Sequence, residues 1–113
     1  MQMPNAVAAL SALAHESRLA VFRLLVRAGP QGLPAGEIAR AIGALPNTLS
    51  THLAILAQAG LIRPRREGRS ILYSADYDGM RALLGFLVED CCQGRPEICA
   101  SLAEPVGRAD CCQ

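Results

Sequence analysis

The sequence predicts a mainly α-helical domain that carries one small β-hairpin. Two observations predict this class. Apolar residues recur at helical spacing in four successive segments before residue 60 and again after residue 76. Between them, residues 61–75 follow a period of two around a Glu-Gly turn. The 113 residues leave room for one domain, and a hydrophobic fraction of 51% is enough for its core.

The first four helices are expected at residues 4–14, 16–28, 34–42 and 46–59. The segment Gly29-Pro30-Gln31-Gly32 ends the second helix, and Pro34 opens the third. Gly43 closes the third helix, and Pro46 opens the fourth after a short turn. Two helices joined in this way form a helix-turn-helix.

The hairpin is expected at residues 61–66 and 69–75, followed by a last helix over 76–92. Four helices, a hairpin and a final helix give the winged helix-turn-helix order. Gly94 and Pro96 break the helical pattern. We therefore divide the chain into a winged helix-turn-helix DNA-binding and dimerisation domain, residues 1–92, and a cysteine-containing tail, residues 93–113.

Charge and composition narrow the function class. Residues 61–75 carry four arginines against Glu67, whereas residues 76–113 carry three arginines against seven acidic residues. The central stretch is the kind of positive patch that meets phosphate groups. There is no apolar run of about 18 residues and no secretory signal, which predicts a cytoplasmic protein with no membrane partner. No catalytic Ser/His/Asp set, carboxylate pair or phosphate loop is present, so neither an enzyme nor an organic cofactor is expected.

The fourth predicted helix has two different faces. One is an apolar stripe that must pack on the other helices: Leu49, Leu53 and Leu56. The other carries small hydroxyl and amide side chains: Asn47, Ser50, Thr51 and Gln58. Such side chains suit a helix in the major groove, although an ordinary solvated face has the same composition. His52, at the edge of the stripe, is expected to be buried and hydrogen-bonded.

Three segments resemble the ArsR/SmtB family of metalloregulatory repressors. Residues 13–25 (LAHESRLAVFRLL) are similar to its second helix, residues 46–62 (PNTLSTHLAILAQAGLI) to its recognition helix, and residues 67–73 (EGRSILY) to its wing. The resemblance covers residues 6–92. It implies a repressor that binds double-stranded operator DNA, with the wing arginines on phosphates or in the minor groove. The candidate DNA-contacting residues are Asn47, Thr48, Ser50, Thr51, Arg65, Arg66 and Arg69.

The last predicted helix has an apolar stripe wider than the core of one chain needs. The first helix adds apolar residues of its own, and in the resembled family these two helices form a homodimer interface. A two-fold dimer lets a short recognition helix engage two half-sites. The candidate interface residues are Val7, Leu10, Leu13, Met80, Leu83, Leu84 and Leu87.

All five cysteines follow residue 90: Cys91, Cys92, Cys99, Cys111 and Cys112. An odd number, in two adjacent pairs and a single, is a poor disulfide framework and favours soft-metal binding or redox sensing. On a helix continued through residue 92, Cys91 lies on the stripe of Leu84 and Leu87, and the break at Gly94 lets Cys99 approach. Three thiolates suit the pyramidal geometry of arsenic(III) or antimony(III), whereas structural zinc prefers four ligands.

The resemblance points to the same effector. Residues 37–40 lack the cysteine pair of many arsenic-responsive members, the last helix has no histidine, and no cysteine precedes residue 91. What remains is similar to the arsenite-responsive branch with ligands after the last helix, here Cys91, Cys92 and Cys99. Cys111 or Cys112 is an alternative third ligand, and a two-thiol site would favour a methylated arsenical. A thiol-redox or persulfide sensor, or a metalloid-buffering protein without DNA binding, also stays open.

Overall fold

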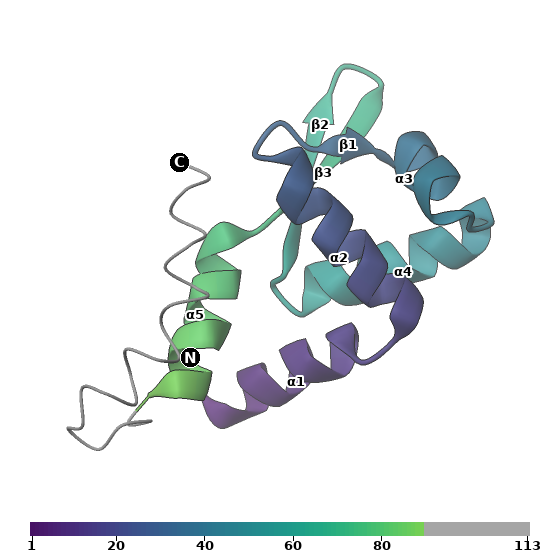
Figure 1. The fold of residues 1–113 in the computed structure, drawn as a ribbon. Coiled ribbons are helices and arrows are strands. Elements are labelled where there is room, and N and C mark those ends of the chain that lie inside the picture. The colour runs from purple at the N-terminus through teal and green to yellow at the C-terminus, as the bar shows by residue number, and fades with distance from the viewer. Residues whose placement is uncertain (90–113) are drawn as a thin grey trace.

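The computed structural model describes residues 1–89, which form helices around a small sheet (Figure 1). The elements are α1 (Met3–Leu13), α2 (Glu16–Ala28), β1 (Leu33–Pro34), α3 (Ala35–Ile42), α4 (Pro46–Gln58), β2 (Ile62–Glu67), β3 (Ser70–Ala75) and α5 (Tyr77–Val88). The predicted mainly α-helical fold with a hairpin is confirmed. The boundaries of the first four helices and of the hairpin lie within one or two residues of those expected from the sequence.

Glycine and proline set the ends of α3 and α4, as predicted. Gly43 adopts the left-handed conformation (φ 77°) after α3, and its N–H donates to the carbonyl of Ala39 at 2.8 Å. This satisfies a carbonyl that the helix end would otherwise leave unpaired. Pro46 occupies the first turn of α4, where a missing N–H costs no intrahelical hydrogen bond.

The sheet has three antiparallel strands in the order β1-β3-β2, one more than the predicted hairpin. Gly68 (φ 63°) turns β2 into β3, and the hairpin register pairs Glu67 with Ser70 and Ile62 with Ala75. The additional strand β1 pairs Leu33 with Tyr73. It ties the segment before α3 to the middle of the wing, so the wing is anchored to the helix-turn-helix.

One core holds the helices and the base of the wing together. Its largest fully buried side chains come from α2, α3, α4 and the turn after α4: Val21, Leu25, Ile38, Leu49, Leu56 and Leu61. The α4 leucines therefore face the other helices, as the apolar stripe predicted. Phe22, the one buried phenylalanine in the described range, joins this aliphatic core.

The N-terminal part of α1 meets the C-terminal part of α5 on the side of the molecule away from the hairpin tip (Figure 1). Helix α5 ends at Val88, and Glu89 has extended dihedrals (φ −58°, ψ 129°). The predicted helix is therefore wrong at Glu89, and the rest of its predicted length, residues 90–92, lies outside the described residues. The five cysteines, and the boundary predicted at residue 92, lie outside the described residues. Within residues 1–89, no helix has both the length and the hydropathy required to cross a bilayer.

Candidate nucleic-acid interface

The outward face of α4 is polar and open. Asn47, Thr48, Ser50 and Thr51 are all exposed, while the leucines of the opposite stripe are buried. The Thr51 hydroxyl donates to the carbonyl of Asn47 at 3.3 Å, which holds that side chain against the helix. The predicted division of α4 into two faces is confirmed. Contact of the polar face with DNA stays a prediction.

The N-terminus of α4 has no side chain that caps it. Leu45 occupies the N-cap position, makes no capping hydrogen bond and is 74% exposed, and the first turn contains no acidic residue. Helix N–H groups left open in this way can bind a phosphate. The sequence analysis did not identify Leu45 as the residue that leaves the N-terminus of α4 uncapped. The signal for it was a leucine at an N-cap position, where Ser, Thr, Asp or Asn is preferred.

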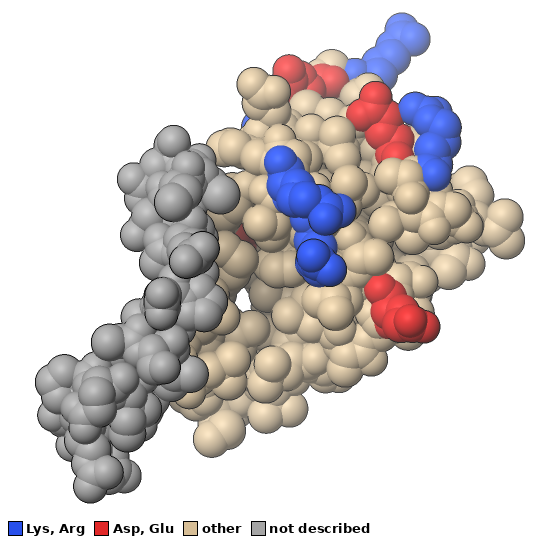
Figure 2. Space-filling view, viewed as in Figure 1, with Lys and Arg blue, Asp and Glu red and all other residues tan. Residues whose placement is uncertain are grey.

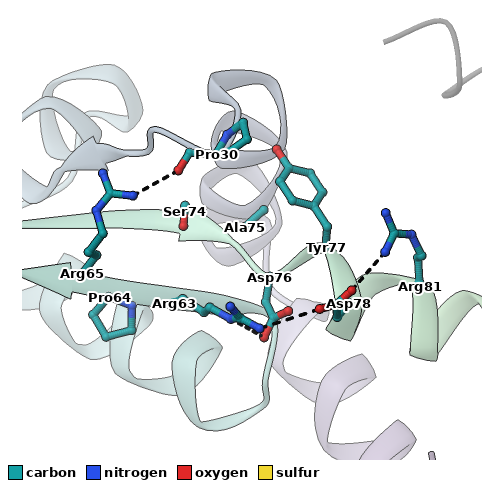
Figure 3. Close-up of a pocket in the computed structure, with 10 residues that line it drawn as sticks. All are labelled: Pro30, Arg63, Pro64, Arg65, Ser74, Ala75, Asp76, Tyr77, Asp78 and Arg81. Carbon is teal, nitrogen blue, oxygen red and sulfur yellow. Dashed lines mark hydrogen bonds and ion pairs between the residues drawn. The ribbon is translucent and has the colours of Figure 1, made fainter. Parts of the chain in front are cut away.

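The three wing arginines do not have the same surroundings. Arg66 and Arg69, next to the hairpin tip, are exposed and make no hydrogen bond or ion pair with any residue of 1–89. Arg65 is engaged: its guanidinium donates to the carbonyl of Gln31 at 3.1 Å and to the Glu67 carboxylate at 3.2 Å. The third guanidinium nitrogen, Nη1, lies 3.5 Å from the carbonyl oxygen of Pro30 (Figure 3). Arg65 thus fastens the wing to the turn between α2 and β1, and Arg66 and Arg69 are the better placed for phosphates.

The positive charge is spread out rather than fused into one patch. Figure 2 shows the arginines in blue at separate places on the viewed face, with acidic side chains in red among them near the hairpin. Arg63, Arg65 and Arg81 are each within 4 Å of a carboxylate in the described chain. The local charge of the wing is therefore partly neutralised.

His52 is buried as predicted, but without the expected hydrogen bond at Nδ1. Only 7% of the residue is exposed, and Nδ1 has no hydrogen-bond partner within residues 1–89. Its ring lies against that of His15, with 4.7 Å between centroids. Desolvation lowers the pKa of His52, and the charges of His15 and Arg18 lower it further. The neutral form is therefore the one that fits this site.

The predicted dimer residues differ in their exposure. Val7, Leu10 and Leu87 are exposed on α1 and α5. Leu13 and Met80 are partly buried and pack on the core, and Leu84 is partly buried as well. Leu83 instead lies in the core of its own chain, with 5% exposed, because it points toward the helices rather than outward. This burial favours a core role for Leu83, and its predicted place in a dimer interface is not tested by the single chain.

Comparisons with known proteins agree with this architecture. A family model described as a helix-turn-helix domain matches residues 13–65. The HTH-type transcriptional regulator YgaV of Escherichia coli (strain K12) is 35% identical over 83 residues, which are 74% of this chain and 82% of YgaV. Since the matched relatives are transcriptional regulators, the prediction that the chain is not an enzyme is confirmed.

Two solved structures add to the comparison. The homodimeric winged helix-turn-helix DNA-binding domain of Mb0332 from Mycobacterium bovis, a possible ArsR-family regulator, has a TM-score of 0.61 and 31% identity. That alignment covers 77% of this chain and 81% of Mb0332. A possible transcriptional regulator for arsenical resistance also has a TM-score of 0.61, with 29% identity over 69% of this chain and 78% of that one.

Proposed function

Because the chain belongs to the ArsR/SmtB family of DNA-binding transcriptional regulators, we propose that it represses transcription as an operator-bound homodimer and is released by arsenite. The observation that carries the DNA-binding part is the open polar face of α4, together with the wing arginines Arg66 and Arg69, which have no partner among residues 1–89. In this proposal α4 lies in the major groove, and the two arginines contact the flanking backbone.

The exposed apolar residues of α1 and α5 support the dimer. Val7, Leu10 and Leu87 lie on two helices that are neighbours in space, and Met3 and Val88 extend the same helices with further exposed apolar side chains. An apolar surface of this kind is costly to leave in water. A second copy of the chain would cover it, as in the homodimeric Mycobacterium bovis domain.

The cysteine set supports arsenite as the effector. Cys91 and Cys92 follow the end of α5 at Val88 by three and four positions, and Cys99 comes seven residues after Cys92. Three thiols that replace the three hydroxyl groups of arsenous acid form three As–S bonds and release three waters. Soft thiolate ligands favour this ion over hard-ligand metals. Antimony(III) would take the same three ligands.

Binding at this place would reach DNA through α5. In the sequence, the proposed dimer helix α5 comes after the wing and before the cysteines. Metalloid binding after its last turn can therefore change the relative orientation of the two subunits. Recognition helices moved in this way no longer match two successive grooves. Such coupling is typically about 1–3 kcal/mol and is reciprocal, so bound operator also weakens arsenite binding.

The test is a release titration on the full chain. An operator selected from randomised DNA is labelled, and fluorescence anisotropy follows its release by arsenite, antimonite and a methylated trivalent arsenical. We expect arsenite to weaken binding by about 10- to 100-fold in the wild type. We expect no release from the C91S/C92S/C99S variant, whose apo form still binds.

The pair C111S/C112S is the matched control, since it removes two thiols from the same tail and should leave release intact. Arsenite release retained without Cys91, Cys92 and Cys99 would overturn the assigned ligands. Release by peroxide without metalloid, with disulfides seen by mass spectrometry, would favour the thiol-redox sensor. A reporter gene activated by the apo protein would overturn repression.

A further inference from the structure

The connection between the wing and α5 is a single residue. Strand β3 ends at Ala75 and α5 begins at Tyr77, so Asp76 alone joins them. Most connections between secondary-structure elements are several residues long. Here the direction of α5 is set by the contacts of one residue and its immediate neighbours.

Asp76 makes contacts with three different segments. Its N–H donates to the carbonyl of Leu61 at 2.8 Å, in the turn between α4 and β2. Its Oδ1 accepts from the N–H of Gly79 at 3.0 Å, in the first turn of α5. Its Oδ2 accepts from Nε of Arg63 at 3.1 Å, on β2 (Figure 3). The backbone of Asp76 thus holds the turn after α4, and its side chain joins the wing to the start of α5.

The backbone packs closely at the same place. A Cβ added at Gly79 would collide with the carbonyl oxygen of Gly60, the second residue after the end of α4. Only glycine permits this approach of two backbones. Close by, the Tyr77 hydroxyl donates to the carbonyl of Val26 on α2 at 3.1 Å. The first turn of α5 is therefore fixed directly against the C-terminal end of α4.

The ion pair of Asp76 with Arg63 goes beyond what a helix cap requires. A cap needs one oxygen on a backbone N–H, which Oδ1 supplies. The Asp76 side chain is 18% exposed and the Arg63 side chain 63% exposed, at the rim of a hollow of about 490 Å³ between the wing base and α5. Desolvation raises the pKa of Asp76, but the hydrogen bond from Gly79 and the bond and charge of Arg63 outweigh it, so the pKa lies below its usual value. The carboxylate is charged at neutral pH and holds Arg63.

We infer that Asp76 is a positioning residue for DNA recognition, because it fixes the angle between α4 and α5 through Arg63 and Gly79. The inference rests on the α5-mediated dimer of the proposed function. In that dimer the angle between α4 and α5 sets the separation of the two recognition helices. Asp76 therefore determines which half-site spacing the protein accepts, without contact to any base.

The test varies the spacing of the DNA. From the operator selected with the wild type, fragments are made with one or two base pairs added or removed between the half-sites. Each base pair shifts a half-site by about 3.4 Å and rotates it by about 35°. We expect the wild type to lose about tenfold in affinity for each such change. For D76N, which keeps an oxygen for Gly79 but loses the charge that holds Arg63, we expect a loss of about threefold or less.

Three controls separate positioning from charge and from folding. D78N makes the same charge change two residues away, on an exposed side chain that pairs with Arg81 at 3.0 Å and lies 3.9 Å from Arg63, without the short bond that Asp76 makes to Arg63. It should keep the wild-type spacing profile. R63Q removes the guanidinium that pairs with Asp76, so it should flatten the profile, which means that affinity depends less on half-site spacing, as in D76N. The double variant D76N/R63Q should flatten the profile no further than either single variant. Affinity for an isolated half-site should be equal for the wild type and D76N, which a general loss of folding would not allow.

Two results would overturn the inference alone: a wild-type spacing profile in both D76N and R63Q, or a flattened profile in D78N. If D76N does not fold, R63Q decides by itself. A different result would overturn the proposed function as well. A wild type that binds one half-site as tightly as two, at every spacing, would not be a dimeric operator-binding protein.

Discussion

His52 illustrates how burial can be predicted from sequence when hydrogen bonding cannot. Its place at the edge of the leucine stripe predicts a covered side chain, and the structure confirms this. The partner of a buried polar atom depends on segments distant in sequence, here the turn that carries His15. The Nδ1 atom without a partner costs stability that the helix pattern does not reveal.

The first prediction concerns His52 and pH. The pKa of His52 is lowered in the folded chain, so between that pKa and the usual value of about 6.5 the unfolded chain binds a proton that the folded chain does not. The free energy of unfolding should therefore fall as pH is lowered through and below this usual value. Urea unfolding between about pH 8 and pH 5 measures it. Asp76, whose pKa is below the usual carboxyl value, titrates in more acid solution and does not interfere.

The control for this prediction is H52Q, which should be less stable at pH 8 but lose less stability on acidification than the wild type. H15N keeps an acceptor for the Ser17 N–H, which His15 now caps at 3.2 Å, and removes the neighbouring imidazole. Its unfolding should still depend on pH, though less steeply. An equal pH dependence in the wild type and H52Q would contradict the assignment.

At the scale of elements, local signals predicted most of the fold. Prolines and glycines marked the ends of α3 and α4, and alternation around Gly68 marked the hairpin. Strand β1 was missed because two residues carry no period, and Pro34 lacks an N–H for a ladder. Its pairing with β3 is a long-range contact that only the assembled fold supplies. Helix was predicted at Glu89 because apolar spacing runs through Val88, whereas the dihedrals of Glu89 are not helical.

The second prediction concerns the turn between α2 and β1, residues 29–32, which the wing contacts through Arg65. Gly29 (φ 86°) and Gly32 (φ 76°) both have positive φ, but only at Gly32 would an added Cβ meet the Tyr73 carbonyl oxygen, at 2.5 Å. G29A should cost about 1–2 kcal/mol through backbone strain alone. G32A should cost about 3 kcal/mol or more, because strain and a backbone collision add. Chemical denaturation of the two variants measures the difference.

The same pair also reports on the wing. Gln31, between the two glycines, supplies the carbonyl that Arg65 binds. G32A should therefore weaken DNA binding in the fraction that stays folded, whereas G29A should bind like the wild type. Equal free energies of unfolding for G29A and G32A would mean that Gly32 does not approach the backbone of β3 closely enough to exclude a Cβ.

At the scale of the whole molecule, periodicity cannot separate a core from an interface. Leu83 and Leu87 share one stripe of α5, yet Leu83 is 5% exposed and Leu87 50% exposed in the single chain. What divides them is the position of α5, which depends on Asp76 and on the close packing of Gly79 against Gly60 rather than on the apolar spacing along α5. The polar face of α4 was predictable because no other segment of the chain is needed to cover it. The hydrogen bonds of Arg65, in contrast, depend on the turn between α2 and β1, which is distant in sequence.

The third prediction uses this pair of leucines. L87E should convert the dimer to monomers and weaken operator binding about 100-fold or more, since a charge replaces an exposed apolar contact and one half-site is lost. L83A should leave the dimer intact but lower the free energy of unfolding by about 2–5 kcal/mol, because it opens a cavity in the core. Sedimentation velocity and denaturation distinguish the two. A dimeric L87E would place the interface elsewhere.

The one-residue joint between β3 and α5 also limits how the length of this chain can change in evolution. The hairpin tip at Gly68 lies open on the surface, where added residues can loop outward. A residue inserted beside Asp76 has no such freedom. If the first turn of α5 kept its place against Gly60, the later residues would advance by one position, which turns their side chains by about 100° around the helix axis. The apolar stripe would then face away from the second subunit of the proposed dimer, so insertions and deletions at this joint should be eliminated by selection even where substitutions are tolerated.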